Sequence, residues 1–494
     1  MIRAKRGASL QDLLFAEGVE FPCGGRGRCK GCKVKLLAGS LPVTGEDRAR
    51  LTADELKQGW RLACRARAEE DLRLELAQWE ATILADDSVF SFTPQEGWGI
   101  AIDLGTTTLA AQLCDLRTGQ VLAVRTALNA QAKHGADIMS RVEFAITSNG
   151  QRILEGSIRE QIGELVQELV AAASPGATKS FAAPSAIVLV GNTVMHHLFC
   201  GIDLEPLAHV PFEPRTPGLQ SFSAAQLGWT LPDNPIVRFL PCLGGFVGSD
   251  ILAGILATKL HEADSLAALI DLGTNGEIVV GNRERMLCAS TAAGPAFEGA
   301  RIAMGMRAAT GAISEVCVED GELNCNVLGQ SEPRGICGSG LVDAVAAGLE
   351  LGRIKSSGRL TQGDSFAIAG PVSLRQQDIR ELQLAKGAIA AGLRILLRQW
   401  GAAMKDVTHV FLAGAFGNYI NQASARRIGL ISFPPEKIQA CGNTALLGAK
   451  LALFGLREHD GTFSEVLEKT RHVSLNEDVQ FQETYVEEMC FPAE

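Results

Sequence analysis

The chain has 494 residues, of which 46% are hydrophobic and 21% are charged, and its formal net charge is −10. The length favours several domains and the composition a folded protein, whereas the acidic total and the aromatic content of 5% disfavour nucleic-acid binding. No apolar run reaches the roughly 18 residues of a membrane span, and the basic N-terminus is not followed by an apolar signal-peptide core. We therefore expect a cytoplasmic protein without nucleic-acid or membrane partners.

Charge is distributed unevenly along the chain. The first 80 residues contain 15 Lys and Arg against 12 Asp and Glu, whereas the other residues contain 31 against 44. The basic residues could offset a nearby anionic centre, or they could form a docking face for an acidic partner. The sequence leaves both interpretations open.

A glycine-rich stretch near the N-terminus, FPCGGRGRCKGCKVK (21–35), contains three cysteines in the spacing C-x5-C-x2-C. The odd total of 13 cysteines argues against a complete disulfide framework. A structural zinc site more often has two C-x2-C pairs, whereas a glycine-rich loop can curl around an inorganic cluster and point N–H groups at its sulfides. We expect a [2Fe–2S] cluster, with a zinc or purely structural site as the alternative. Its expected ligands are Cys23, Cys29, Cys32 and Cys64.

The segments around these cysteines predict a small folded module. SLQDLLFAEGV (9–19) is typical of a short helix, CKVKLLAGS (32–40) of a strand and turn, and DLRLEL (71–76) of a closing strand. Residues 1 to 80 resemble a β-grasp ferredoxin of the adrenodoxin type. That fold opens with a two-strand hairpin, but only MIRAKRG precedes the expected helix, so the first strand could be missing. Residues 81–97 lack periodicity, which predicts a linker.

The rest of the chain contains a duplicated motif. GIAIDLGTTTLAAQLCDLRTGQVLAV (99–124) and ALIDLGTNGEIVVGNRERMLC (268–288) each predict a strand, a D-L-G-T turn, a strand, a reverse turn and a strand. In each copy a carboxylate ends a buried strand, and the following glycine lets backbone N–H groups approach an oxyanion. Two such turns that face each other would bind a polyphosphate and its Mg²⁺.

The residue types suggest roles within these turns. Asp103 and Asp271 are expected to hold Mg²⁺ through water, because Mg²⁺ loses its hydration shell reluctantly. The expected phosphate-binding residues are Gly105, Thr106, Thr107, Thr108, Gly273, Thr274 and Asn275. A third element, THVFLAGAFGNYI (408–420), predicts an apolar strand that runs into a glycine-rich turn and a helix. The residues expected against the adenine or ribose of ATP are Gly414, Phe416 and Gly417.

Taken in order, the three motifs resemble the two phosphate motifs and the adenosine motif of the actin, sugar kinase and Hsp70-type ATPase superfamily. The resemblance implies two hinged lobes, each built on a ribonuclease H-like mixed sheet flanked by helices, with nucleotide in the cleft between them. We therefore expect an α/β and α+β multidomain chain with lobes at 98–260 and 261–460 and a C-terminal extension at 461–494. GICGSGLVDAVAAGLELG (335–352) predicts a helix that begins near this cleft.

Three further segments narrow the resemblance: VGNTVMHHLF (190–199), GGFVGSDILAGIL (244–256) and STAAGPAFEGARIAMGM (290–306). Together with the N-terminal [2Fe–2S] module, they resemble the reductive activators of corrinoid-dependent methyltransferases. The resemblance implies an ATP-dependent iron–sulfur protein that passes one electron from its cluster to inactive Co(II) and so restores Co(I) in a corrinoid protein. It also implies a low-potential electron donor and a homodimer.

Some features of these segments have alternative explanations. Asp250 could position a water molecule for catalysis near the nucleotide, or it could cap the helix that starts there. His196 and His197 could be cobalt ligands, or they could pack the junction between a strand and a helix. Two other functions also fit the motifs: an ATP-gated electron injector for another low-potential enzyme, and a small-molecule kinase or chaperone-like ATPase with a redox-sensing cluster.

Overall fold

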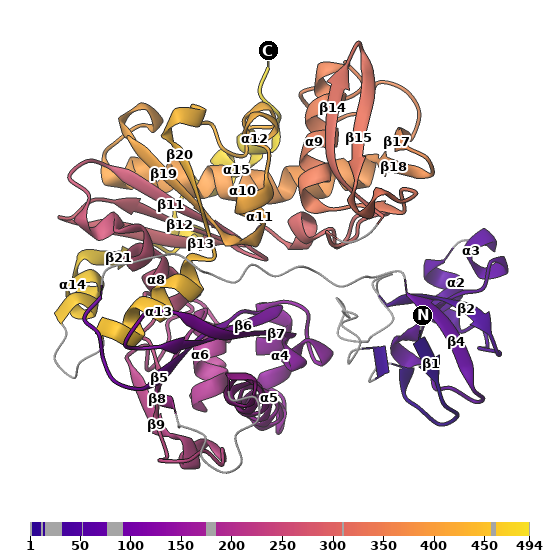
Figure 1. Ribbon diagram of the computed structural model, residues 1–494. Helices are drawn as coiled ribbons and strands as arrows, with labels where there is room; N and C mark the ends of the chain where they lie inside the picture. The colour runs from indigo at the N-terminus through magenta and orange to yellow at the C-terminus, as the bar shows by residue number, and fades with distance from the viewer. Residues whose placement is uncertain are drawn as a thin grey trace.

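The computed structural model describes residues 2–10, 13–14, 32–51, 53–76, 92–173, 184–308, 311–455 and 461–493. Within these ranges the chain forms an N-terminal module and two larger sheets, with a pair of helices between the sheets (Figure 1). None of the helices in these ranges combines the length and the apolar character needed to cross a membrane.

The N-terminal module is built on a four-stranded sheet. Its strands are β1 (Ile2–Ala4), β2 (Lys33–Ala38), β3 (Trp60–Leu62) and β4 (Leu72–Leu76), in the order β1-β4-β2-β3, and its helices are α2 (Gly45–Arg50) and α3 (Ala53–Lys57). The strands predicted at 32–40 and 71–76 are confirmed. β1 pairs antiparallel with β4, so one strand does precede the predicted helix. That helix, at 9–19, lies largely outside the described residues.

Two large mixed sheets repeat one arrangement. The first contains β5 (Trp98–Leu104), β6 (Thr108–Asp115), β7 (Val121–Leu128), β8 (Pro184–Val190), β9 (Gln220–Ser223) and β10 (Ile236–Phe239). The second contains β11 (Ala267–Leu272), β12 (Gly276–Gly281), β13 (Met286–Thr291), β19 (His409–Ala413), β20 (Ile438–Gly442) and β21 (Thr470–His472). In both, three antiparallel strands are extended by parallel strands, in the orders β7-β6-β5-β8-β10 and β13-β12-β11-β19-β20. The predicted strands of both copies are confirmed, and the architecture is the expected ribonuclease H-like one.

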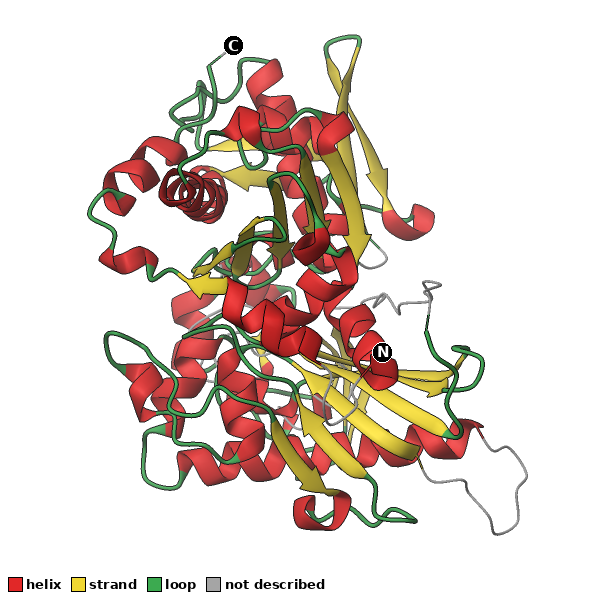
Figure 2. Cartoon of the chain, turned by 90° about the vertical axis from the view of Figure 1, so that its left-hand side faces the viewer, coloured by secondary structure: helices red, strands yellow, loops and turns green. Residues whose placement is uncertain are grey.

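Helices α8 (Ser249–Thr258) and α13 (Thr444–Gly455) lie between the two sheets (Figure 1, Figure 2). Their apolar side chains share one core with residues of both sheets, such as Val188 and Leu269. The two helices cross closely, since a Cβ at Gly448 would lie 2.2 Å from the carbonyl oxygen of Ala253. This packing joins the first sheet to a helix that follows β20 of the second sheet in sequence.

The other helices cover the outer faces of the sheets, except α14, whose Phe463 and Val466 belong to the core between the sheets. The first lobe has α4 (Ile138–Ala145), α5 (Gly150–Ala173), α6 (Thr193–Cys200) and α7 (Glu205–Ala208), and the second has α10 (Gln376–Trp400), α11 (Gly414–Tyr419), α12 (Gln422–Arg427), α14 (Gly461–Lys469) and α15 (Phe481–Met489). A smaller part projects from the second lobe (Figure 1) and contains β14 (Ala312–Glu319), β15 (Glu322–Val327), β16 (Gly335–Ile336), α9 (Gly338–Glu350), β17 (Ser365–Ala369) and β18 (Val372–Arg375). The helix predicted within 335–352 is therefore confirmed as α9.

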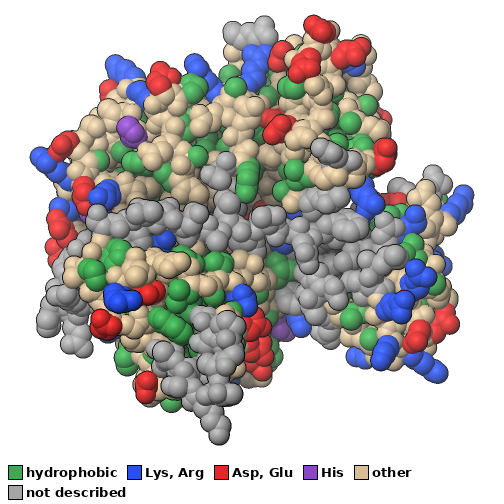
Figure 3. Space-filling view, viewed as in Figure 1, with side chains coloured by type: hydrophobic (Ala, Val, Ile, Leu, Met, Phe, Trp, Pro, Cys, Tyr) green, Lys and Arg blue, Asp and Glu red, His purple; other side chains and the backbone are tan. Residues whose placement is uncertain are grey.

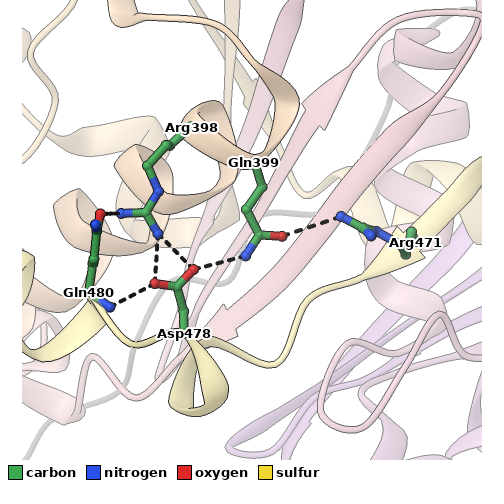
Figure 4. A network of polar contacts seen from close by, with 5 residues as sticks. All are labelled: Arg398, Gln399, Arg471, Asp478 and Gln480. Atoms are coloured by element: carbon green, nitrogen blue, oxygen red, sulfur yellow. Dashed lines mark hydrogen bonds and ion pairs between the residues drawn. The ribbon is translucent and has the colours of Figure 1, made fainter.

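The C-terminal segment packs against the second lobe. β21 pairs in parallel with β13, and α15 packs along α10. A polar network joins these parts (Figure 4): Arg398 Nη2 donates to both carboxylate oxygens of Asp478 at 2.7 Å. The Gln399 side chain links the same carboxylate to Arg471. The end of the chain thus completes the sheet that holds the second D-L-G-T turn.

Candidate functional site

The N-terminal module brings two of the predicted cluster ligands together. Cys32 directly precedes β2, and Cys64 follows the end of β3. The N–H of Ala63 donates to the carbonyl of Cys32 at 3.1 Å, so both cysteines lie at the same end of the β2–β3 pair. Cys32 is 1% exposed and Cys64 is 4% exposed. Two neighbouring buried thiols fit a [2Fe–2S] site, whereas Cys23 and Cys29 lie outside the described residues.

The first D-L-G-T turn connects β5 to β6 and is tight. The N–H of Gly105 donates to the carbonyl of Thr108 at 3.1 Å, and a Cβ at Gly105 would lie 2.5 Å from that oxygen. Only glycine fits this position. The Thr106 hydroxyl accepts a hydrogen bond from Asn192 Nδ2 at 2.8 Å, and Asn192 is the N-cap of α6. The turn is therefore attached to the start of that helix.

The second D-L-G-T turn connects β11 to β12 and faces the first. Its backbone closes through a hydrogen bond of 3.1 Å from the N–H of Gly273 to the carbonyl of Asn275. The hydroxyl oxygens of Thr107 and Thr274 are 3.4 Å apart, although the two residues are 167 positions apart in the chain. Thr274 also donates a short hydrogen bond to Glu298. The structure thus brings the two predicted phosphate turns together between the lobes.

Four carboxylates that are half-buried or buried influence one another beside these turns. Burial raises the pKa of Asp103 to about 6, and burial followed by repulsion from Asp103 raises the pKa of Asp271 to about 7. Burial, then Asp103 and Asp271, raises the pKa of Asp250 to about 8, and burial also raises the pKa of Glu277. Within the described residues, no Lys, Arg or His is among the groups that shift these pKa values. Desolvated carboxylates without a cationic partner favour the binding of a cation.

These carboxylates do not form a direct metal-chelating group. In the described ranges, no set of three or more His, Cys, Asp or Glu side chains is close enough to hold a metal ion. Asp103 Oδ2 instead accepts a hydrogen bond from Asn443 Nδ2 at 3.1 Å. Carboxylates too far apart to chelate one ion directly could still bind a hydrated Mg²⁺ through its waters, because that ion usually keeps several waters in nucleotide sites.

Asp250 lies in the first turn of α8 but does not cap the helix. Gly248 occupies the cap position, and Asp250 Oδ1 accepts a hydrogen bond from the N–H of Ile251 at 2.9 Å. Asp250 is therefore not the N-cap residue, although its carboxylate accepts one N–H group of the first turn. The side chain belongs to the four carboxylates beside the phosphate turns, and its positioning of a water molecule stays a prediction.

The predicted adenosine segment is placed by its packing on the second phosphate turn. α11 begins at Gly414, which has a φ of +85°. A Cβ at this position would lie 2.6 Å both from Asp271 Oδ1 and from the carbonyl oxygen of Leu272. The glycine is thus required for the close approach of two protein segments, and its contact with adenosine stays a prediction.

The other two residues predicted for adenosine lie in α11. The ring of Phe416 stacks on that of Phe297, with 4.6 Å between the ring centroids. Gly417 is buried, and a Cβ there would lie 3.1 Å from the Leu412 side chain. Because Phe297 precedes Glu298, this stacking connects the adenosine segment to the partner of Thr274.

Several polar residues of the site were not predicted from the sequence. They are Asn129, Arg141, Asn192, Glu277, Glu298 and Asn443. Asn192, Glu277 and Glu298 occur within the motif segments of the sequence. Their position in those segments could have identified them as candidate site residues. Asn443 follows Asp103 by 340 positions and belongs to no motif.

Two buried histidines lie in α6, next to the first phosphate turn. His196 and His197 are 0% exposed. His197 Nδ1 lies 2.9 Å from the carbonyl of Thr193, so it carries a hydrogen and donates to that oxygen, and His196 Nδ1 lies 3.3 Å away. The ring of His196 also packs edge-on against Phe239. This geometry supports a packing role, because completely buried imidazoles cannot reach the cobalt of a partner protein.

Acid is expected to destabilise the protein through these histidines. Burial lowers the pKa of His196 from 6.5 to about 3 and that of His197 to about 4. The unfolded chain therefore binds more protons below pH 6.5, and each histidine should remove about 2 kcal/mol of stability between pH 6.5 and about pH 5. His196→Met should flatten this dependence in urea unfolding between about pH 5 and about pH 7. The same pH slope in both proteins would contradict the assignment.

Comparison with known protein families assigns the three parts of the chain. Residues 1–69 match the 2Fe-2S iron-sulfur cluster binding domain. Residues 98–263 match the RACo middle region, and residues 265–494 match the C-terminal domain of RACo, the ASKHA domain.

Individual relatives cover most of the chain. It is 34% identical over 444 residues to the corrinoid activation enzyme RamQ of Eubacterium limosum, covering 83% of this chain and 74% of the relative. It is 28% identical over 385 residues to the [Co(II) methylated amine-specific corrinoid protein] reductase of Methanosarcina barkeri, covering 72% and 69%. A solved reductive activator for a corrinoid, iron-sulfur protein superposes with a TM-score of 0.71 and 27% identity, over 99% of this chain and 96% of that one. The chain therefore belongs to the family of reductive activators of corrinoid proteins.

Proposed function

We propose that the chain uses ATP to gate the transfer of one electron from a [2Fe–2S] cluster to an inactive Co(II) corrinoid protein, which restores Co(I) for methyl transfer. The observation that most supports this function is the 3.4 Å contact between Thr107 and Thr274. Because each hydroxyl belongs to a different lobe, a polyphosphate bound there would respond to the distance between the lobes. The name of the Methanosarcina barkeri relative supports Co(II) in a corrinoid protein as the electron acceptor.

ATP and Mg²⁺ would bind between the two D-L-G-T turns. Asp103 and Asp271 would hold the hydrated metal ion, since both are partly desolvated and neither has a cationic partner among the described residues. The residues proposed to bind phosphate are Gly105, Thr106, Thr107, Thr108, Gly273, Thr274 and Asn275. The segment from Gly414 to Gly417 would bind the adenosine.

Four thiolates would hold the cluster, which acts as a one-electron carrier when bound. They come from Cys23, Cys29, Cys32 and Cys64. Plant-type [2Fe–2S] centres have potentials near −400 mV, and the family resemblance implies a cobalt couple that is harder to reduce. Each mismatch of about 59 mV costs a factor of ten, or about 1.4 kcal/mol. Another source of free energy must therefore favour the transfer.

The binding of ATP and Mg²⁺ would supply that free energy, and movement of the lobes would transmit it to the corrinoid protein. We propose that residues 98–260 and 261–460 act as the two lobes, with 81–97 as the tether of the cluster module. In the ATP-bound arrangement they would select a corrinoid-protein conformation whose cobalt has lost an axial ligand, which makes Co(II) easier to reduce. A ligand must discriminate between two states by about 5.5 kcal/mol to shift them from about 1:99 to about 99:1. Binding through two phosphate turns and Mg²⁺ can supply energy on that scale.

The proposed partners are a corrinoid protein and a low-potential electron donor. Lys and Arg side chains are spread over the visible described surface of the N-terminal module (Figure 3), in agreement with its excess of basic residues. This charge would help the module to meet an acidic partner. We further propose a homodimer in the cytoplasm, which rests on the sequence and the family resemblance.

Affinity capture tests the proposed acceptor. The reduced, ATP-loaded chain is used to retain proteins from its own anaerobic extract, and cobalt is measured in the eluate with and without nucleotide. We expect cobalt in a corrinoid protein, and more of it with ATP. Recovery of a low-potential enzyme without cobalt would instead favour an ATP-gated electron injector.

A further inference from the structure

The first phosphate turn is held from behind by two residues. Asn129 Nδ2 donates to the carbonyl of Gly105, and the N–H of Asn129 donates to the carbonyl of Thr107, both at 2.9 Å. Arg141 Nη2 donates a short hydrogen bond to the carbonyl of Thr106. Three successive carbonyls of the turn are therefore occupied by Asn129 and Arg141.

Both residues lie on the same side of the turn, because Asn129 Nδ2 is 3.5 Å and Arg141 Nη1 is 3.4 Å from the sulfur of Met195. In a trans peptide, a carbonyl and the N–H of the next residue point in opposite directions. The amides of Thr106 and Thr107 therefore point away from Asn129 and Arg141, and neither donates to an acceptor within the described residues. Successive N–H groups that point in one direction form a concave site for an anion.

Arg141 places a buried positive charge behind this amide pair. Its side chain is 0% exposed, and its other oxygen acceptors are the carbonyl of Gly135 at 2.9 Å and Gln131 Oε1 at 3.3 Å, which are neutral. Asp137 favours the charged form, but its carboxylate accepts the N–H of Ser140 at 2.8 Å, and no ion pair to Arg141 occurs among the described residues. Burial lowers the pKa of Arg141 to about 9, so the guanidinium is still charged at pH 7.

A buried charge without an anionic partner is costly. A phosphate in front of the turn would be such a partner, separated from the guanidinium by a single peptide group. The hydrogen bond from Arg141 withdraws electron density from the Thr106 carbonyl and so makes the Thr107 N–H a stronger donor. The charge can therefore act on a phosphate that Arg141 does not touch.

We propose that Arg141 is the positioning residue of the first phosphate turn and that its charge favours nucleotides with more phosphate groups. This inference rests on the proposed nucleotide site and extends it to a residue outside the D-L-G-T motif. A merely structural arginine would affect all nucleotides alike, whereas a charge behind the amides must act more strongly on ATP than on ADP, and least on AMP.

Calorimetric titration of the holoprotein with the magnesium complexes of ATP and ADP, and with AMP, tests this inference. Arg141→Met removes the charge at similar length and should raise the Kd for ATP about 10- to 100-fold, with a smaller factor for ADP and little change for AMP. Arg141→Lys keeps the charge and should recover part of the ATP affinity. If Arg141→Met does not fold, Arg141→Gln, which is also neutral but can still donate to the Thr106 carbonyl, provides the same comparison.

Arg159→Met is a matched control in the same lobe. Arg159 also donates to a backbone carbonyl, that of Phe199 at 2.7 Å, but it lies away from the turn. Its loss should therefore lower the unfolding temperature without changing the order of the Kd values for ATP, ADP and AMP. Equal losses for ATP, ADP and AMP in the neutral variants, or Kd values that these variants leave unchanged, would overturn the inference while leaving the nucleotide site intact. Failure of the unaltered protein to bind ATP would overturn the proposed site as well.

Discussion

Asp271→Asn should lower the nucleotide-dependent rate of Co(II) corrinoid reduction by about 100- to 1000-fold, the cost of removing one preorganised charge from a reaction centre. Asp271 is the second-last residue of β11, opposite the other phosphate turn, and burial and Asp103 raise its pKa to about 7. Asparagine keeps the shape of the side chain but removes a charge that would hold hydrated Mg²⁺. The rate is measured anaerobically from the absorbance of Co(I).

Stability separates this effect from simple misfolding. Asp271 repels Asp103 and Asp250 in the protein without metal, so neutralising it should leave the unfolding temperature equal or higher. Asp264→Asn is the matched control, because Asp264 is exposed and pairs only with Arg283 on the described surface. A reduction rate in Asp271→Asn equal to that of the control would contradict the assigned role.

Cys64→Ser should abolish the cluster and with it all electron transfer, while nucleotide binding continues. Cys64 is buried beside Cys32, and a serine hydroxyl is too hard and too weakly acidic a ligand to replace a thiolate on iron. Iron and sulfide content, visible absorbance and the Kd for ATP are measured on the same preparation.

Cys317→Ser provides the control for this variant. Cys317 is exposed on β14, far along the chain from the N-terminal module, and its replacement should leave the iron content unchanged. Full iron and sulfide content in Cys64→Ser would contradict the assignment of Cys64 as a cluster ligand. Loss of ATP binding together with iron would show instead that the substitution disturbs the whole chain.

The strands of the two lobes could be predicted because each copy of the motif has a buried apolar strand that ends in D-L-G-T. That local pattern determines both the strand and the turn. β1 was harder to predict, since a three-residue strand has no measurable alternation and is stabilised by its pairing with β4. β21 is similar: Thr470–His472 is polar, and only its position beside β13 makes it a strand.

The contacts that complete the site could not be predicted from local patterns. Asn443 reaches Asp103 because α13 returns to the first sheet, which is a property of the chain path over 340 positions. Arg141 reaches the Thr106 carbonyl from a helix whose sequence shows no phosphate motif. Gly414 was predicted from its residue type, but the side chain of Asp271 and the carbonyl of Leu272, which leave no room for a Cβ there, are brought to it only by the fold.

Nucleotide is proposed to control the transfer of an electron to cobalt. The most direct measurement is a titration of Co(II) corrinoid protein with the chemically reduced chain, in which Co(I) absorbance is followed without nucleotide, with ADP and with ATP and Mg²⁺. We expect rapid and extensive formation of Co(I) only with ATP and Mg²⁺. Equal rate and yield of Co(I) in the absence of nucleotide would contradict it.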